Sequence, residues 1–243
     1  MSRFNAFAIH LGISLAIFFV LAYLVVFEWY PGLFFDTDGG WQGMRIIIGV
    51  DLVLGPTLTL IVFKAGKPGL KTDLTLIGLL QFVCLFAGTY VVYEQRPQLV
   101  AFNDGRFTVM TDEDFDGDTA LPDLTSFPGD DPKWVLVEIP QDPIAEAEFR
   151  SATFKQGKLI ATATENYIPF RTDHQQFISN ALDPAIILAK EGGPEAIDQW
   201  VAEHGGSAED YRFYIFSTRY TYGYVGFRES GGEPLGLLKV LAY

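Results

Sequence analysis

Residues 44–63, MRIIIGVDLVLGPTLTLIVF, decide how the first part of this chain folds. The stretch has the length of about 20 apolar residues that a helix needs to cross a membrane. Asp51 lies inside it, and an aspartate near the centre of a membrane helix costs roughly 3 kcal/mol on insertion scales. Gly55 and Pro56 follow, and the proline removes a backbone donor and frees a carbonyl. The stretch therefore predicts a membrane helix with two polar groups that need partners.

The distribution of charge divides the chain into two parts. Its 243 residues have a mean hydropathy of +0.20 and a formal charge of −13. Basic and acidic side chains balance in residues 1–93, so the whole net charge lies in residues 94–243. We expect a transmembrane region in the first part and, in the second, a water-soluble domain large enough to bury its own core. The acidity of that domain argues against nucleic acid as a partner.

Three apolar segments are long enough to cross the lipid bilayer as helices, and they lie at about residues 6–27, 44–63 and 74–93. The first has no cleavage site behind it and is interpreted as a retained helix. Loop 64–73 carries three lysines, whereas loop 28–43 has no Lys or Arg, so the lysine loop is expected in the cytoplasm. The N-terminus is then cytoplasmic, and residues 94–243 lie in the periplasm of a bacterium.

Packing of the second and third helices as a hairpin predicts which polar groups meet. If the hairpin turns at residues 68–69, Gln81 lies opposite Pro56, where its amide could reach the free Leu52 carbonyl. With the turn at this position, Asp51 has no polar partner on the third helix. Asp51 must therefore find a partner on the first helix, stay protonated, or wait for another protein.

The first helix offers His10 and Ser14, which share a face at i, i+4 spacing. Both lie near the expected cytoplasmic end, so we do not expect them to meet Asp51 easily. For His10, Asp51 and Gln81, a structural hydrogen bond within the bundle competes with a functional role.

The second part predicts an α+β domain built on an antiparallel sheet. Asp104-Gly105 is typical of a two-residue hairpin turn between two short strands. Further strands are expected at 134–140, 211–219, 221–228 and 235–243, and helices at 142–156, 174–190 and 194–204. The aromatic side chains of 211–227 are interpreted as sheet core in preference to a binding face.

Residues 112–123, DEDFDGDTALPD, partly match a calcium-binding loop. The residues at ligand positions 1, 3, 5 and 12 of such a loop are Asp112, Asp114, Asp116 and Asp123. A glutamate is usual at the last position, and no flanking helices are predicted. A solvated acidic loop is the favoured interpretation, and no metal or cofactor is predicted.

Enzyme and transporter functions are not favoured. The soluble part has only two histidines and no cysteine, so no nucleophile arrangement is visible. An intramembrane aspartyl hydrolase needs two facing carboxylates, and Asp51 and Asp73 are expected at opposite sides of the hairpin. The acid and the Gly-Pro break are also typical of transporters, but three helices without an internal repeat would have to oligomerise.

An ordered series of residues in the first 97 positions forms a further pattern: His10-Leu11 with Ser14, WYPG at 29–32, GVDLVLGPTLTLIVFK at 49–64, Lys67, Lys71, Asp73-Leu74, Gln81, Gly88 and Arg96-Pro97. This series resembles the type IV pilin accessory proteins of the TfpX/TfpZ group. The resemblance implies a non-enzymatic protein of the inner membrane that supports pilin stability or pilus assembly.

Under this hypothesis, the membrane helix of a pilin packs in a groove lined by Asp51, Pro56 and neighbouring small residues. The intramembrane polar or partner-binding candidates are His10, Ser14, Asp51, Gly55, Pro56, Lys71, Asp73 and Gln81. The alternative is a membrane-anchored periplasmic sensor or binding domain, for which calcium is a candidate ligand.

Overall fold

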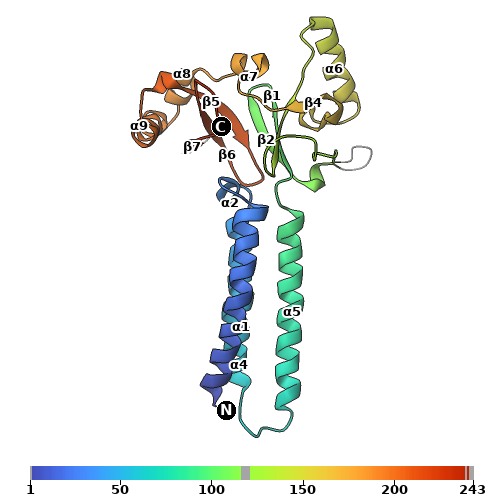
Figure 1. Cartoon of the computed structure of the whole chain (residues 1–243), viewed down its shortest axis with the longest axis vertical. Coiled ribbons are helices and arrows are strands. Elements are labelled where there is room, and N and C mark those ends of the chain that lie inside the picture. Colours follow the sequence, from blue (N-terminus) through green and yellow to red (C-terminus); the bar gives the residue numbers. More distant parts are fainter. Residues whose placement is uncertain (1, 116–120, 239, 241–243) are drawn as a thin grey trace. The chain divides into compact units, whose positions relative to one another are not determined.

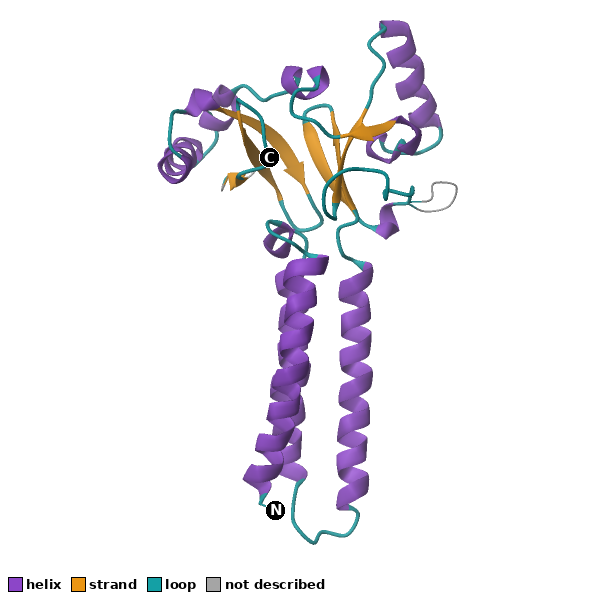
Figure 2. Cartoon of the chain, in the orientation of Figure 1, coloured by secondary structure: helices purple, strands orange, loops and turns teal. Residues whose placement is uncertain are grey.

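The chain consists of two compact units, which divide between Arg96 and Pro97 (Figure 1). The computed structural model describes residues 2–115, 121–238 and 240. We call residues 1–96 the helical unit and residues 97–243 the sheet unit. Figure 2 shows long helices in the first unit and a sheet with short helices around it in the second.

The helical unit contains three helices that are long and apolar enough to cross a membrane, at Arg3–Trp29, Gly40–Val62 and Leu70–Glu94. The first is α1 (Arg3–Tyr23) followed by a π-helical segment (Leu24–Trp29). The second is α3 (Gly40–Ile47), a π-helical segment (Ile48–Leu54) and α4 (Gly55–Val62); the third is α5 (Leu70–Glu94). A short helix, α2 (Phe34–Thr37), lies in the first connection.

The prediction of three membrane-length helices is therefore confirmed, but each begins three or four residues earlier than predicted. The second and third helices are preceded by Gly39 and Gly69, whose φ angles of 101° and 80° suit glycine. These glycines turn the chain into the helix before the apolar run itself begins.

The sheet unit is built on seven strands in the order β4-β3-β1-β2-β5-β6-β7 within the described residues. Their bounds are β1 Leu99–Asn103, β2 Arg106–Met110, β3 Lys133–Val137, β4 Tyr167–Pro169, β5 Tyr211–Ser217, β6 Tyr222–Arg228 and β7 Gly236–Leu238. Asp104 and Gly105 join β1 to β2, and their φ angles of 48° and 74° are positive, as a two-residue hairpin turn requires. The predicted hairpin is confirmed.

The α+β class is also confirmed, but the sheet is mixed. β1 pairs with β3, and β2 with β5, in parallel; the other neighbouring pairs are antiparallel. Parallel neighbours need long crossover connections. The chain supplies them between residues 110 and 133 and between residues 110 and 211, so the β1–β2 hairpin has a parallel strand on each side.

Three of the helices around the sheet begin at a proline in the first turn. Asp142 caps α6 (Pro143–Lys155) by accepting from the backbone N–H of Ile144 and Ala145, which confirms that predicted start. The helix predicted at 174–190 is instead two short helices, α7 (Gln175–Ser179) and α8 (Pro184–Leu188), because Pro184 restarts the chain. α9 spans Gly193–His204.

The two faces of the sheet are packed differently. One face carries a cluster of aromatic rings that includes Phe102, Phe107, Phe177, Tyr214 and Phe227. On the other face, Trp200 of α9 packs on Phe213 of β5, and a short turn at Ile160–Thr162 packs on β1. Since the aromatic side chains of β5 and β6 are largely buried, the core interpretation is confirmed. Part of the predicted strand 235–243 lies outside the described residues.

Candidate functional site

Five polar side chains from all three long helices meet inside the helical unit. We call them the polar network: His10 and Ser14 of α1, Asp51 of the second π-helical segment, Thr59 of α4 and Gln81 of α5. Ser14 and Asp51 are each only 1% exposed. Buried polar groups are costly unless they are paired, so each of these side chains needs a hydrogen-bond partner inside the unit.

The helix ends explain why three of these side chains meet. Ser14 lies eleven residues from Arg3, Asp51 eleven residues from Val62, and Gln81 eleven residues from Leu70. The start of the first helix, the end of the second and the start of the third lie at one end of the bundle (Figure 1). At 1.5 Å per residue, each of the three side chains lies about 16 Å from that end. The three side chains are therefore at one level.

Gln81 is the centre of the network. Its amide nitrogen donates to Asp51 Oδ1 and lies 3.4 Å from both Ser14 Oγ and the Asp51 carbonyl oxygen. Ser14 Oγ also donates to Asp51 Oδ1, over 3.1 Å. The expectation that Asp51 has no partner on the third helix is therefore wrong, and so is the expectation that Ser14 would not easily meet it.

His10 joins the network through Gln81 and Thr59. Gln81 Oε1 is an acceptor and lies 2.9 Å from His10 Nε2, so Nε2 carries the proton and donates. In the neutral imidazole, His10 Nδ1 then accepts from the Thr59 hydroxyl, at 2.5 Å. The hydrogen bonds run in one direction, from Thr59 through His10 and Gln81 to Asp51. His10 is thus linked to Asp51 by way of Gln81.

The Gly-Pro break fits the same arrangement. The Gly55 N–H donates to the Val50 carbonyl, five residues back, so the next carbonyl in this π-helical register is that of Asp51. Pro56 has no N–H to donate to it, and the Gln81 amide lies 3.4 Å from this oxygen. The Gln81 amide therefore lies at the carbonyl of Asp51, whereas the sequence predicted that it could reach the carbonyl of Leu52.

Gly55 makes room for the network. An ideal Cβ at position 55 would lie 2.0 Å from Gln81 Oε1, so a larger residue would displace the amide. Gly55, Pro56 and Asp51 are all buried within the unit. One acceptor is left over: Asp51 Oδ2 has no hydrogen-bond partner among the described residues.

The remaining membrane-region candidates lie apart from this network. Lys71 is exposed in the first turn of α5. Asp73 pairs with Lys67 at 2.5 Å, and both side chains are partly exposed. At the other end of the unit, the sequence reasoning missed a contact: the Tyr30 hydroxyl donates to the Val92 carbonyl over 2.7 Å.

The acidic loop uses two of its aspartates in local turns. Asp114 accepts from the backbone N–H and hydroxyl of Thr111, and Asp123 accepts in the same way from Thr125. Asp116 lies outside the described residues. Within residues 2–115, 121–238 and 240, no group of three or more His, Cys, Asp or Glu side chains is placed to hold a metal ion.

Comparisons with known proteins define the class. The model of the family "Fimbrial assembly protein FimB" matches residues 1–32. Three relatives from Dichelobacter nodosus are named fimbrial assembly proteins. The serogroup I protein is 27% identical over 75% of this chain and 81% of its own length. The serogroup E1 protein is 32% identical over 49% of each chain. The protein of serogroups C1 and C2 is 32% identical over 48% of this chain and 87% of its own length.

The class is therefore that of fimbrial assembly proteins with helices long enough to cross a membrane. More particularly, the chain belongs to the fimbrial assembly protein FimB family. This agrees with the resemblance to type IV pilin accessory proteins that the first 97 residues carry. No solved structure matches the chain.

Proposed function

We propose that this chain is an accessory protein of the bacterial inner membrane that binds the fimbrial subunit, a type IV pilin, and stabilises it until it enters the fibre. The observation that carries the proposal is membership of a family named for fimbrial assembly. A pilin has an apolar helix and a globular head. A helical unit of membrane length and a separate sheet unit suit those two parts.

The proposed orientation follows from the positive charges near the helix ends. Lys64, Lys67 and Lys71 lie at the turn between the second and third helices. Lysines near short loops favour the cytoplasmic side. The N-terminus then lies in the cytoplasm, and the sheet unit lies in the periplasm beside the heads of unassembled subunits.

We propose a structural role for the polar network within this function. Asp51 is 1% exposed and already accepts from Ser14 and Gln81, so it contributes to partner binding by fixing the three helices. Cross-helix hydrogen bonds in membranes contribute about 1–2 kcal/mol each in model peptides. A groove lined by Asp51 and Pro56, as expected from the sequence, does not fit this structure because both residues are buried. In the proposed complex, the subunit helix therefore packs on the outer surface of the bundle, and no catalytic step is involved.

Deletion of the gene tests the proposal. In the deletion strain, pulse-labelled subunit should be degraded faster than in the parent strain, and surface fibres should be lost. A plasmid copy of the wild-type chain should restore both. Normal fibres and an unchanged subunit lifetime in the deletion strain would reject the function.

The orientation needs a separate measurement. Alkaline phosphatase joined after residue 243 is active only outside the cytoplasm, so the proposed orientation predicts an active enzyme. Activity from a fusion at residue 66 and none from the fusion at residue 243 would place the sheet unit in the cytoplasm and would contradict the proposal.

A further inference from the structure

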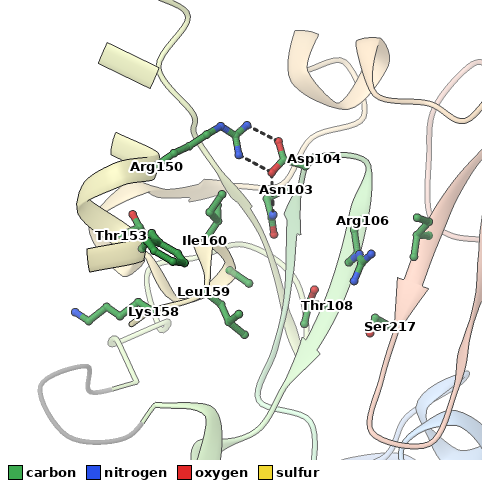
Figure 3. A pocket seen from close by; sticks show the side chains of 13 residues that line it. Asn103, Asp104, Arg106, Thr108, Arg150, Thr153, Lys158, Leu159, Ile160 and Ser217 are labelled. Atoms are coloured by element: carbon green, nitrogen blue, oxygen red, sulfur yellow. Dashed lines mark hydrogen bonds and ion pairs between the residues drawn. The ribbon is translucent and has the colours of Figure 1, made fainter. Parts of the chain in front are cut away.

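A groove with a volume of about 710 Å³ opens on the sheet unit (Figure 3). Its floor is formed by β1, β2 and β5, and includes Arg106, Thr108 and Ser217. One wall is formed by α6 and the residues after it, including Arg150, Phe154 and Leu159. All the residues of the groove belong to one unit.

The groove exists because the middle of this sheet face is left uncovered. In the parallel β2–β5 pair, Arg106 lies beside Ile215 and Thr108 beside Ser217, so these four side chains share a face. The same face carries Phe213 two residues before Ile215, and there α9 covers it. A covered face would carry apolar residues, but at this point the chain has a cation and two hydroxyls.

The cations of the groove contrast with the rest of the unit. Residues 97–243 contain 11 Lys and Arg and 24 Asp and Glu. Two of the cations, Arg106 and Lys158, line the groove, and neither forms an ion pair with an acid among the described residues. Arg106 donates to the Tyr222 hydroxyl over 2.9 Å; a guanidinium has five N–H groups, so donors are left for a ligand.

Arg150 has a different role in the wall. It forms two hydrogen bonds with the Asp104 carboxylate, at 2.7 and 3.0 Å, which Figure 3 shows as dashed lines. It also donates from Nε to Glu146, over 2.8 Å. These bonds tie α6 to the β1–β2 turn and hold the wall in place, so the cations available to a ligand are Arg106 and Lys158.

Apolar side chains and an unpaired acceptor add to these cations. Phe154 is 83% exposed and Leu159 is 63% exposed, and both line the groove. Large exposed apolar side chains that line one groove are typical of an interaction site. Asn103 also lines the groove, and its Oδ1 is buried without a hydrogen-bond partner among the described residues.

We propose that this groove binds a segment of the fimbrial subunit's head in which a carboxylate side chain lies beside an apolar one. The inference rests on the proposed function and names the surface that serves it. Arg106 and Lys158 bind the carboxylate, and Phe154 and Leu159 cover the apolar side chain. An acidic segment is repelled by most of the unit and attracted here, so charge complementarity selects this site.

Photocrosslinking in fimbriated cells tests the groove with the full chain. A benzophenone amino acid replaces Phe154 in one strain and Ile144 in another. Ile144 is the matched control because it lies on α6, is 70% exposed and does not line the groove. We expect an adduct with the fimbrial subunit from position 154 and little or none from position 144. Equal adducts from both positions, or an adduct with lipid alone, would overturn the proposal.

Charge variants give the second arm of the test. Combined with the probe at position 154, the double variant R106Q/K158E should lower the yield of the adduct about tenfold, since it removes both cations that face a bound carboxylate. Lys155→Glu makes the same charge reversal as K158E, but on α6 and outside this groove, and it should leave the yield unchanged. An adduct that resists the double variant would overturn the proposal.

One further variant, compared with the wild-type chain, keeps the outcomes distinct. Phe154→Ser removes a side chain that is already 83% exposed, so it should lower subunit capture without unfolding the unit. If the wild-type chain captures subunit and Phe154→Ser captures it equally well, the groove inference fails while the proposed function stands. If the wild-type chain captures no subunit at all, the proposed function fails, and the groove inference fails with it.

Discussion

Gly55→Ala is the sharpest perturbation of the helical unit. The new methyl group would lie 2.0 Å from Gln81 Oε1, 2.4 Å from its Cδ and 2.6 Å from its Nε2. The amide can move, but it then leaves its bonds to His10 and Asp51. The cost of the substitution is therefore the loss of these hydrogen bonds.

The magnitude follows from those bonds. Two cross-helix hydrogen bonds at about 1–2 kcal/mol each give a loss of about 3 kcal/mol. The higher helix propensity of alanine returns up to about 1 kcal/mol. We expect Gly55→Ala to lower the free energy of unfolding by about 2 kcal/mol, which is a change of roughly 30-fold in the unfolding equilibrium.

Gly49→Ala is the matched control. It lies in the same membrane-length helix, and an added Cβ there meets nothing within 4 Å. This variant gains the helix propensity and loses no hydrogen bond, so its stability should equal or exceed that of the wild type. The two variants should differ by about 3 kcal/mol, for the same change in chemistry.

The assay is a titration with SDS in mixed micelles, using the full chain with dyes at the starts of α1 and α5. Energy transfer between the dyes falls when the helices separate, and the midpoint reports the free energy of unfolding. Equal midpoints for Gly55→Ala and Gly49→Ala would refute the claim that the polar network holds the three helices together.

Three further substitutions test other contacts. Tyr30→Phe removes the buried hydrogen bond to the Val92 carbonyl and should cost about 1–2 kcal/mol in the same SDS titration; no change would show that the contact is not needed. Gly226→Ala puts a methyl group 2.3 Å from an indole carbon of α9; overpacking of about 1–3 kcal/mol should lower the melting temperature of the sheet unit, read by near-ultraviolet circular dichroism. Arg150→Gln removes the guanidinium that lowers the pKa of Asp104. An aspartate with a lowered pKa stabilises the fold at pH values above its ordinary pKa, so this variant should be less stable than the wild type at pH 7, by up to about 1 kcal/mol. The deficit should shrink as the pH falls below that ordinary pKa and through the lowered pKa of Asp104; a deficit independent of pH would contradict this.

The sequence predicted the helices of the first unit better than their register. Length and apolarity were enough for the three helices, and residue chemistry was enough to single out Asp51 and Gln81. Their pairing could not be predicted because it depends on where the helices end. A hairpin turn at 68–69 assumes that the two helices end at equal distances from that point. The second helix instead ends at Val62, and the third begins at Leu70. This difference moves Gln81 from Pro56 to Asp51.

In the sheet unit, local signals were sufficient and long-range pairings were not. Asp104-Gly105 predicted a hairpin because the turn is encoded by two adjacent residues. The parallel pairing of β2 with β5 joins residues about 100 positions apart, and no local pattern encodes it. The groove depends on that pairing, which brings Arg106 beside Ile215. A basic residue in an acidic domain was the only available signal.

The most direct measurement of the central claim is purification of the tagged full chain from the membranes of fimbriated cells in a mild detergent. The amount of unassembled fimbrial subunit that copurifies is then measured against an unrelated membrane protein of similar abundance. Binding and stabilisation of the subunit predict that it is recovered with this chain well above that background. Recovery of the subunit at background level would contradict the proposed function.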